Sequence, residues 1–149
     1  MPRQKVTTFL WFESQAEEAA NFYVSLFKNS RITHVTPGST GTAFVVEFEL
    51  AGIQYIALNG GPMFKFNEAI SLSVDCADQC EVDEIWGKLS EGGSDFNCGW
   101  LKDRYGLSWQ IVPTVLPGLM KDASGRVMQA LMQMTKLDIQ KLQDAYDGR

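Results

Sequence analysis

Polar side chains recur at alternate positions in three segments that are otherwise rich in bulky apolar residues. Successive side chains of a strand point to opposite faces, so each set shares one side of its strand. Apolar walls that carry a few hydrogen-bonding groups are typical of small-molecule clefts. The same residues would also suit the edge of a core whose hydroxyl groups are satisfied, so both interpretations stay open. The sets are Thr7, Phe9 and Trp11; Ser71 and Ser73; and Ser108, Gln110 and Val112.

The segment GGPMFKFNEAI, residues 60–70, has an unusual composition for a connection. Loops run over the surface and are usually polar, yet this one sets Phe64 and Phe66 beside Lys65 and Asn67. One interpretation is that the aromatic rings face a ligand or a partner subunit, and that Lys65 or Asn67 supplies a polar contact. The other is that the rings pack on the body of the protein and Lys65 is solvated.

The sequence contains none of the common catalytic motifs: it has no Gly-x-Ser-x-Gly, no Walker loop and no His-Glu-x-x-His. The turn after the first apolar run reads Ser14-Gln15-Ala16, without the glycines that a methyltransferase binding adenosylmethionine would need. An isomerase or lyase that works through Gln110, Ser71 and Lys102 stays open as an alternative. Lys102 could also pair with an acidic ligand beside Trp100, with which it shares one side of CGWLKD.

Cysteine and histidine offer little for a metal or redox site. The three cysteines make no Cys-x-x-Cys pair, and Cys76 and Cys80 stand four residues apart in DCADQC. A redox or metal role for Cys76 and Cys80 stays open, but free cysteine is most often a small buried residue, which is the interpretation we favour for these two. The sequence assigns no role to Cys98. The single histidine, His34, falls in the alternating segment RITHVT and is expected at an exposed strand position.

Length and charge limit the classes of function. The chain has 149 residues and a net charge of −5, which predicts one domain and argues against nucleic acid or an anionic membrane as a partner. No run of about 18 apolar residues is present, and the start MPRQKVTTF lacks the apolar core of a signal peptide. We therefore expect a cytoplasmic protein.

The elements that must position these residues follow from the apolar spacing. Strands are expected over 6–12, 31–36, 42–50 and 53–59, with a hairpin at Ala51-Gly52, and a helix after Ser14, which would form a capping box with Glu17. A second set follows: a strand over 69–76, a helix over 78–89, a turn with at most a short strand over 92–97, and two strands within 98–113. After a break at Pro117-Gly118, residues 125–134 and 137–146 are expected to form helices that pack through a Met and Leu face.

The two sets of elements are copies of one pattern. Placing AEEAANFYVSL over QCEVDEIWGKL matches Glu18 with Glu81 and Leu26 with Leu89 at one constant offset (81 − 18 = 63). Each copy reads strand–helix–strand–strand–strand, and the second is abbreviated in its middle.

With this pattern in place, the chain resembles the PhnB-like branch of the vicinal oxygen chelate superfamily, which includes glyoxalase and bleomycin resistance proteins. The resemblance covers residues 5–113 and rests on AEEAANFY, ALNGGPMFKFNEAISL and CGWLKDRYGLSWQIVP. It implies a single α+β domain, 1–149, of two βαβββ modules (about 5–59 and 68–113) whose curved mixed sheet surrounds a cavity, followed by a helical tail over 115–147. It also implies a homodimer, which in this branch commonly shares strands between subunits.

The resemblance also places the metal-ligand positions of the superfamily. Metal-dependent members use one histidine or glutamine and one carboxylate from each module. Here those positions hold Thr7, Ala57, Ala69 and Gln110. Such side chains lack the imidazole or carboxylate donors that a divalent transition metal requires, so we expect no metal and no cofactor.

The sequence therefore predicts a metal-independent small-molecule-binding protein whose ligand is flat and apolar or aromatic. The alternatives are an enzyme, either a metal-free isomerase or lyase or the methyltransferase that the usual family label suggests, and an interaction scaffold with a filled interior. The residues expected to line the cavity are Thr7, Phe9, Trp11, Tyr55, Phe64, Asn67, Ser71, Trp100, Lys102 and Gln110.

Overall fold

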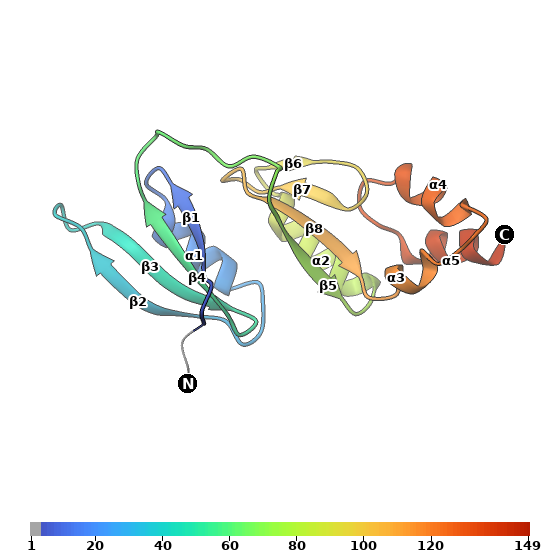
Figure 1. Cartoon of the computed structure of the whole chain (residues 1–149), viewed down its shortest axis with the longest axis horizontal. Coiled ribbons are helices and arrows are strands. Elements are labelled where there is room, and N and C mark those ends of the chain that lie inside the picture. Colours follow the sequence, from blue (N-terminus) through green and yellow to red (C-terminus); the bar gives the residue numbers. More distant parts are fainter. Residues whose placement is uncertain (1–3) are drawn as a thin grey trace. The chain divides into compact units, whose positions relative to one another are not determined.

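A computed structural model describes residues 4–149 of the chain. The chain divides into two compact units, Met1–Phe66 and Asn67–Arg149. Each unit contains one four-stranded mixed sheet, and the order of elements is the same in both, strand–helix–strand–strand–strand (Figure 1). The expected α+β fold with two βαβββ modules is thus confirmed, and the strands form two separate sheets rather than a closed barrel.

The first unit consists of β1 (Thr8–Phe12), α1 (Ala16–Val24), β2 (Arg31–Pro37), β3 (Ala43–Leu50) and β4 (Ile53–Asn59). Its strands lie in the order β1-β4-β3-β2; β1 pairs with β4 in parallel, and the other pairs are antiparallel. The helix α1 covers one face of this sheet, where Tyr23 packs on Phe48 of β3 with ring centroids 6.4 Å apart. The hairpin at Ala51-Gly52 is present, and both residues have positive φ, 50° and 84°, as a tight turn between right-twisted strands requires.

The start of α1 differs from the sequence prediction. Gln15 rather than Ser14 occupies the N-cap position, and the Gln15 side chain makes no capping hydrogen bond. The backbone N–H of Ala16 instead donates to Asn59 Oδ1 at 2.8 Å, and Asn59 Nδ2 donates to the carbonyl of Ala43 at 2.9 Å. A side chain of β4 therefore satisfies the helix N-terminus, so the predicted capping box of Ser14 and Glu17 is wrong.

The second unit begins with β5 (Ser71–Cys76), α2 (Gln79–Ser90), β6 (Ser94–Asp95), β7 (Trp100–Lys102) and β8 (Ser108–Pro113). The strand order β5-β8-β7-β6 repeats that of the first unit, again with the first strand parallel to the last. Asp78 caps α2 by accepting from the backbone N–H of Glu81 at 2.9 Å. The expected abbreviation is confirmed, because β6 has only two residues.

The turn between β7 and β8 is organised by a buried carboxylate. Asp103 is 3% exposed. Its Oδ1 accepts from the backbone N–H groups of Tyr105 and Leu107 at 2.8 and 3.1 Å, and its Oδ2 accepts from Trp109 Nε1 at 2.9 Å. The segment DRYGLSW thus encodes a turn in which one acidic side chain satisfies three donors.

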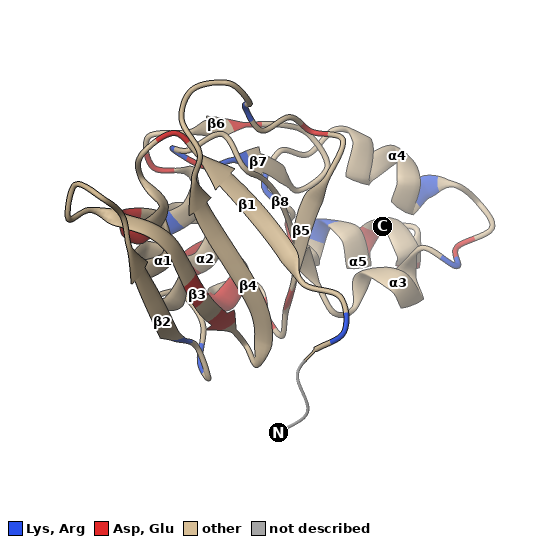
Figure 2. Ribbon diagram, turned by 60° about the vertical axis from the view of Figure 1, so that its left-hand side comes forward, with Lys and Arg blue, Asp and Glu red and all other residues tan. Residues whose placement is uncertain are grey.

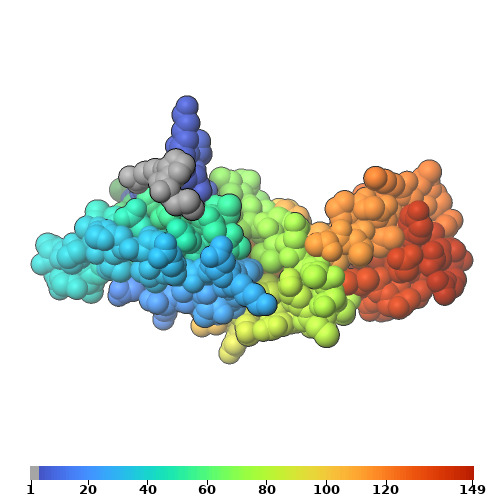
Figure 3. Space-filling model, turned by 90° about the horizontal axis from the view of Figure 1, so that it is seen from below, coloured from blue at the N-terminus to red at the C-terminus, as the bar shows by residue number. Residues whose placement is uncertain are grey.

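The C-terminal residues form α3 (Leu116–Leu119), α4 (Arg126–Met132) and α5 (Ile139–Asp147), which pack around one apolar cluster and gather at the red end of the chain in Figure 3. Pro117-Gly118 does not break the chain as expected, because both residues lie in α3, and proline is well tolerated in a first helical turn. Met120 and Met134 pack against the cluster, whereas Met132 is 58% exposed, so the expected Met face packs only in part. The cluster consists of Leu119, Val127, Leu137 and Leu142.

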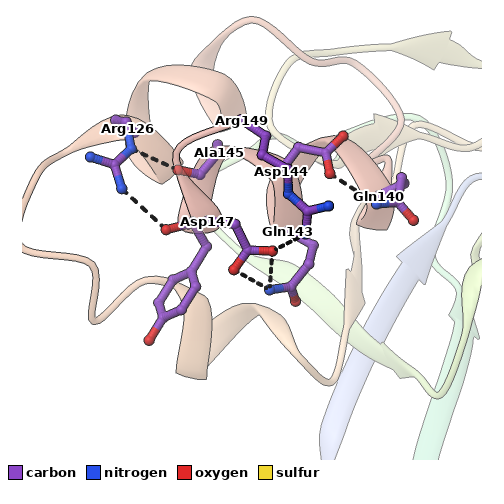
Figure 4. A network of polar contacts seen from close by, with 8 residues as sticks. Arg126, Gln140, Gln143, Asp144, Ala145, Asp147 and Arg149 are labelled. Carbon is purple, nitrogen blue, oxygen red and sulfur yellow. Dashed lines mark hydrogen bonds and ion pairs between the residues drawn. The ribbon is translucent and has the colours of Figure 1, made fainter.

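Polar contacts hold these helices together and join them to α2. Arg126 donates to the carbonyls of Ala145 and Tyr146 at 2.8 and 3.1 Å, which closes α4 against the end of α5 (Figure 4). Gln79 of α2 donates to the carbonyl of Leu137 at 3.0 Å and accepts from the N–H of Ile139 at 2.8 Å. The tail is therefore part of the second unit. Within residues 4–149, no helix is both long and apolar enough to cross a bilayer.

Replacement of Asp103 should destabilise the protein strongly. Asp103→Ala leaves two backbone N–H groups and the Trp109 indole N–H without their acceptor, so we expect a loss of about 2–4 kcal/mol in the free energy of unfolding. Urea denaturation followed by tryptophan fluorescence measures this loss. Asp95→Ala, at an exposed position of β6, is the matched control and should change stability little. A loss for Asp103→Ala no larger than that of the control would contradict this role.

Candidate ligand-binding site

One face of the second sheet collects the polar residues that the sequence singled out. In the register, Ser71 of β5 stands beside Ser108 of β8, which stands beside Lys102 of β7. Ser73, Gln110 and Trp100 form the next such row. Residues paired in this way point to the same side of a sheet. The opposite side carries Leu101, Trp109 and Ile111, all buried on the side covered by α2.

A hydrogen bond links two strands across this face. Gln110 Nε2 donates to Ser71 Oγ at 2.9 Å, and both side chains are half-buried. The predicted association of Ser71 with Gln110 is thus present in the structure. The pair leaves the amide oxygen of Gln110 and the proton of the Ser71 hydroxyl for other contacts.

A cavity of about 260 Å³ opens beside the first row. Ser108 is 1% exposed, and its Oγ has no hydrogen-bond partner among the described residues. Buried hydroxyl groups are nearly always satisfied, so this one calls for a partner that would enter the cavity. The cavity is lined by Glu68, Phe96, Asn97, Trp100, Leu101, Lys102 and Ser108.

An ion pair lies at the same cavity. Lys102 Nζ is 2.9 Å from Glu68 Oε2, and it also lies 5.7 Å from the centroid of the Phe96 ring. The hydrogen bond from Lys102 and its positive charge hold the pKa of the Glu68 carboxyl below its usual value. Glu68 therefore stays ionised at neutral pH. Its ion pair with Lys102 is lost only when the pH falls far enough to protonate the Glu68 carboxyl. Lys102 was expected to be able to pair with an acidic ligand; in the structure its partner is Glu68 of the same chain, and pairing with a ligand stays a prediction.

Asn67 makes a local contact. Its Oδ1 accepts from the backbone N–H of Ala69 at 2.9 Å, which is the turn that asparagine commonly makes with its own chain. The residue is exposed. Its carbonyl oxygen thus braces the approach to β5, and it does not line the cavity of the second unit.

The first unit presents aromatic residues on the face of its sheet opposite α1. Phe9 and Trp11 of β1 stand beside Ile56 and Leu58 of β4 in the register. Trp11 Nε1 donates to the carbonyl of Gly61 at 2.9 Å, and the Phe64 ring meets the Trp11 ring edge-on with centroids 4.9 Å apart. Thr7 is half-buried and precedes the first residue of β1.

The part of the segment that belongs to the first unit, residues 60–66, therefore packs in part on that unit. Phe66 meets Phe12 edge-on with centroids 5.2 Å apart, so two rings of the segment lie on β1. Phe64 nevertheless stays 58% exposed, and Lys65 is exposed as well. Phe66 packs on the protein and Lys65 is solvated, as the second interpretation expects. The exposed part of Phe64 can still contact another molecule.

Tyr55 lies on a different face from the one expected. The register places it beside Thr8 and Phe48, and its ring stacks on that of Phe48 at 5.7 Å, on the α1 side of the sheet. Burial raises the pKa of its hydroxyl. Tyr55 therefore does not share a face with Phe9 and Trp11. The prediction failed because β4 has apolar residues on both sides, so the sequence does not show which side faces the helix.

The side chains at the expected ligand positions, and the described residues around them, do not fit a divalent metal. Strands β1, β4 and β8 contain no histidine, cysteine or carboxylate. Figure 2 shows no charged residue along β1. Ala57 is fully buried on the α1 side of the sheet, so it does not occupy the inward position assigned to it. Ala69 is exposed and precedes β5. Across residues 4–149, no three His, Cys, Asp or Glu side chains come close enough to hold a metal ion. Thr7 and Gln110 add only neutral oxygen and amide donors.

Cys76 is an unsuitable ligand or nucleophile. It is fully buried at the end of β5, and burial, reinforced by the carboxylates of Glu81, Asp75 and Asp78, raises the pKa of its thiol to about 12. The reactive form of cysteine is the thiolate, which such a pKa suppresses at neutral pH. Cys80 is exposed, so the expectation that it is buried is wrong, whereas the expectation holds for Cys76. Cys98 is half-buried, and all three thiols are free.

Sequence reasoning did not single out five of the residues along the cavity as ligand-contacting: Glu68, Phe96, Asn97, Leu101 and Ser108. Ser108 had been placed on the correct face but was left out of the expected lining. Glu68 and Phe96 lie outside the alternating segments, in connections whose course depends on tertiary structure. The sequence did contain one signal for Ser108: a short hairpin between the last two strands would pair it with Lys102, which was already expected at the cavity.

Two modules of this topology are the fold of the vicinal oxygen chelate superfamily, to which the glyoxalase and bleomycin resistance proteins belong. A family model described as 3-demethylubiquinone-9 3-methyltransferase matches residues 4–112. The chain belongs to this family, the PhnB-like branch of the superfamily. Comparison with curated protein sequences gives no match.

Solved structures agree with this assignment. A PhnB protein from Bacillus cereus, provisionally named 3-demethylubiquinone-9 3-methyltransferase, is 36% identical, with a TM-score of 0.71, over 74% of this chain and 100% of its own. A glyoxalase/bleomycin resistance protein/dioxygenase domain from Frankia is 13% identical, with a TM-score of 0.52, over 75% of this chain and 93% of its own. The fosfomycin resistance protein FosX from Listeria monocytogenes is 14% identical, with a TM-score of 0.56, over 79% and 97%. The last two likenesses concern the fold alone.

Gly60 should be required by the close approach of Trp11. A Cβ built at Gly60 would overlap the six-membered ring of that indole, so Gly60→Ala must displace the ring and should cost about 1–3 kcal/mol in unfolding free energy. Gly87→Ala is the matched control, because nothing lies within 4 Å of its Cβ and it sits inside α2. The control should gain about 0.5–1 kcal/mol. Urea unfolding gives both values, and equal stability of Gly60→Ala and the wild type would contradict the packing described.

Proposed function

We propose that this protein is a metal-independent small-molecule-binding protein of the glyoxalase/bleomycin resistance type. The observation that carries this proposal is the face of β5, β8 and β7, where Ser71 and Gln110 lie beside Trp100 and next to an open cavity of about 260 Å³. An aromatic wall with a few fixed polar groups is the usual composition of a site for a small organic molecule. A scaffold with a filled interior would leave no such space.

The first unit supports the same proposal with an aromatic group of its own. Phe9 is 60% exposed and Phe64 58% exposed, and Trp11 and Thr7 are half-buried. Large exposed aromatic side chains commonly mark surfaces that bind a ligand or a partner. We propose that they contact a flat, apolar part of a ligand.

An enzyme is the alternative. The family description names a methyltransferase, but the connection from β1 to α1, Glu13-Ser14-Gln15, contains no glycine for the close approach of a nucleotide. An isomerase or lyase would rely on Lys102, Gln110 and Ser71. The structure occupies these groups with one another or with Glu68, at 2.9 Å in each case. A catalytic role would require these side chains to leave their present partners, whereas ligand binding does not. We therefore prefer a binding function.

Ligand and metal screens by thermal unfolding test the proposal. We expect at least one planar aromatic compound to raise the Tm by several degrees, since a ligand that binds only the folded state stabilises it in proportion to its excess over Kd. Zinc, nickel and manganese should change the Tm by less than about 1 °C, because no donor set holds them. Stoichiometric metal in the purified protein, or a metal-dependent rise of many degrees, would refute metal independence. Micromolar binding of adenosylmethionine in calorimetry would instead favour the methyltransferase.

We also propose that the chain forms a homodimer and works in the cytoplasm. Phe44 and Ile53 add to the apolar surface of the first unit, being 50% and 51% exposed, and apolar surface of this kind suits an interface. The three unpaired cysteines suit a reducing compartment.

Light scattering during gel filtration tests the dimer. We expect a mass of about twice the 16.6 kDa of the chain at micromolar concentration. Hydrogen exchange at β1 and β3 should then be slowed relative to a diluted sample, because an interface over Phe9 or Phe44 excludes water. A monomer mass maintained at concentrations of about 100 µM would contradict the proposal.

A further inference from the structure

We propose that the cavity beside Ser108 binds an aromatic carboxylate, and that the carboxylate of the ligand takes the place of the Glu68 carboxylate at Lys102. This inference rests on the proposed small-molecule-binding function and adds the class of ligand. Its basis is the juxtaposition of an unsatisfied hydroxyl, a fixed cation and two aromatic side chains around one space.

Ser108 supplies the first requirement. Its side chain is 1% exposed and lines the cavity, and its Oγ makes no hydrogen bond within the described residues. A buried hydroxyl in this state costs stability unless something satisfies it. An atom that satisfies it must come from inside the cavity, and a carboxylate oxygen is an acceptor that a serine hydroxyl can serve.

Lys102 supplies the second requirement. It pairs with Ser108 across the antiparallel β7 and β8, so both side chains rise from neighbouring points of one face. Paired residues of this kind have Cβ atoms about 4.5–5.5 Å apart. One carboxylate has two oxygens, and it can therefore accept from the Lys102 ammonium with one and from the Ser108 hydroxyl with the other.

Glu68 is the group that a ligand would displace. Its side chain is 65% exposed and lies outside any strand, whereas Lys102 is 28% exposed and held over the Phe96 ring. Ion pairs with a solvated partner contribute little to stability, so Glu68 leaves at small cost. A cationic ligand would instead have to displace Lys102, the better held of the two. The structure thus favours an anion.

The remaining lining determines the rest of the ligand. Trp100 and Phe96 provide aromatic surface. A cavity of roughly 150 Å³ lined by apolar side chains holds one benzene molecule. The 260 Å³ found here has room for a larger ring system, such as two fused rings with one carboxylate.

Calorimetric titration of the full chain with three matched probes tests this inference. The probes are 2-naphthoate, 2-naphthamide and 2-naphthylmethylamine, which share the rings and differ in charge. We expect 2-naphthoate to bind, and the amide and the amine to bind at least tenfold more weakly. Binding of the amide or the amine as tight as that of the acid would overturn the inference.

Variants of the chain identify the groups responsible. Lys102→Met should weaken 2-naphthoate at least tenfold, and Glu68→Gln should tighten it several-fold by removing the competing carboxylate. Glu84→Gln is the matched control, because Glu84 forms a similar pair with Lys88 at 2.9 Å on the exposed side of α2. It should leave the Kd unchanged. An unchanged Kd in Glu68→Gln would contradict the exchange.

Ser108→Ala separates a ligand contact from a structural role. The hydroxyl has no hydrogen-bond partner among residues 4–149, so its removal should leave the Tm unchanged or raised while it weakens 2-naphthoate several-fold. A lowered Tm with unchanged affinity would contradict the inference. If the three probes fail but another planar compound raises the Tm, the carboxylate inference fails and the proposed binding function stands. If no compound binds at all, both fail.

Discussion

The buried carboxylate of Asp103 is the constraint on which the candidate site depends. By holding the N–H groups of Tyr105 and Leu107 and the indole of Trp109, it fixes where β7 ends and β8 begins. A strand that slips by one residue turns every side chain to the opposite face. Such a slip of β8 would move Ser108 and its neighbours toward α2 and bring Trp109 to the surface. The polar face and the apolar core beneath it are thus set by one interaction, which lies outside the cavity.

The repeat in the sequence predicted the fold well because it is a property of spacing. The helical spacing of apolar residues and the hairpin at Ala51-Gly52 depend on residues close in the chain, and both are present. Contacts between distant residues were not predictable in the same way. The cap of α1 comes from Asn59, 43 residues further along the chain, and the partner of Lys102 comes from a loop 34 residues earlier (102 − 68 = 34). Neither pairing leaves a local pattern.

The candidate site was predicted in part for the same reason. Alternation placed Ser71, Gln110, Trp100 and Lys102 on one face correctly, since each belongs to a strand whose other side is clearly apolar. It failed for Tyr55, because β4 is apolar on both sides and only pairing with β3 decides between them. Family resemblance located the metal positions only approximately, so Ala57 was assigned inward although it packs under α1.

The two modules share a topology but offer different chemistry, and this difference bears on how the fold can work without a metal. The first sheet presents Phe9 and Trp11, whereas the second presents hydroxyl and amide groups and one lysine. A metal ion binds ligand oxygens strongly and largely determines their orientation. Without one, orientation has to come from hydrogen bonds and a single charge, each of which is modest when water can compete. Under the proposed function, affinity would then come mainly from burial of aromatic surface, and hydrogen bonds and charge would select among ligands of similar shape.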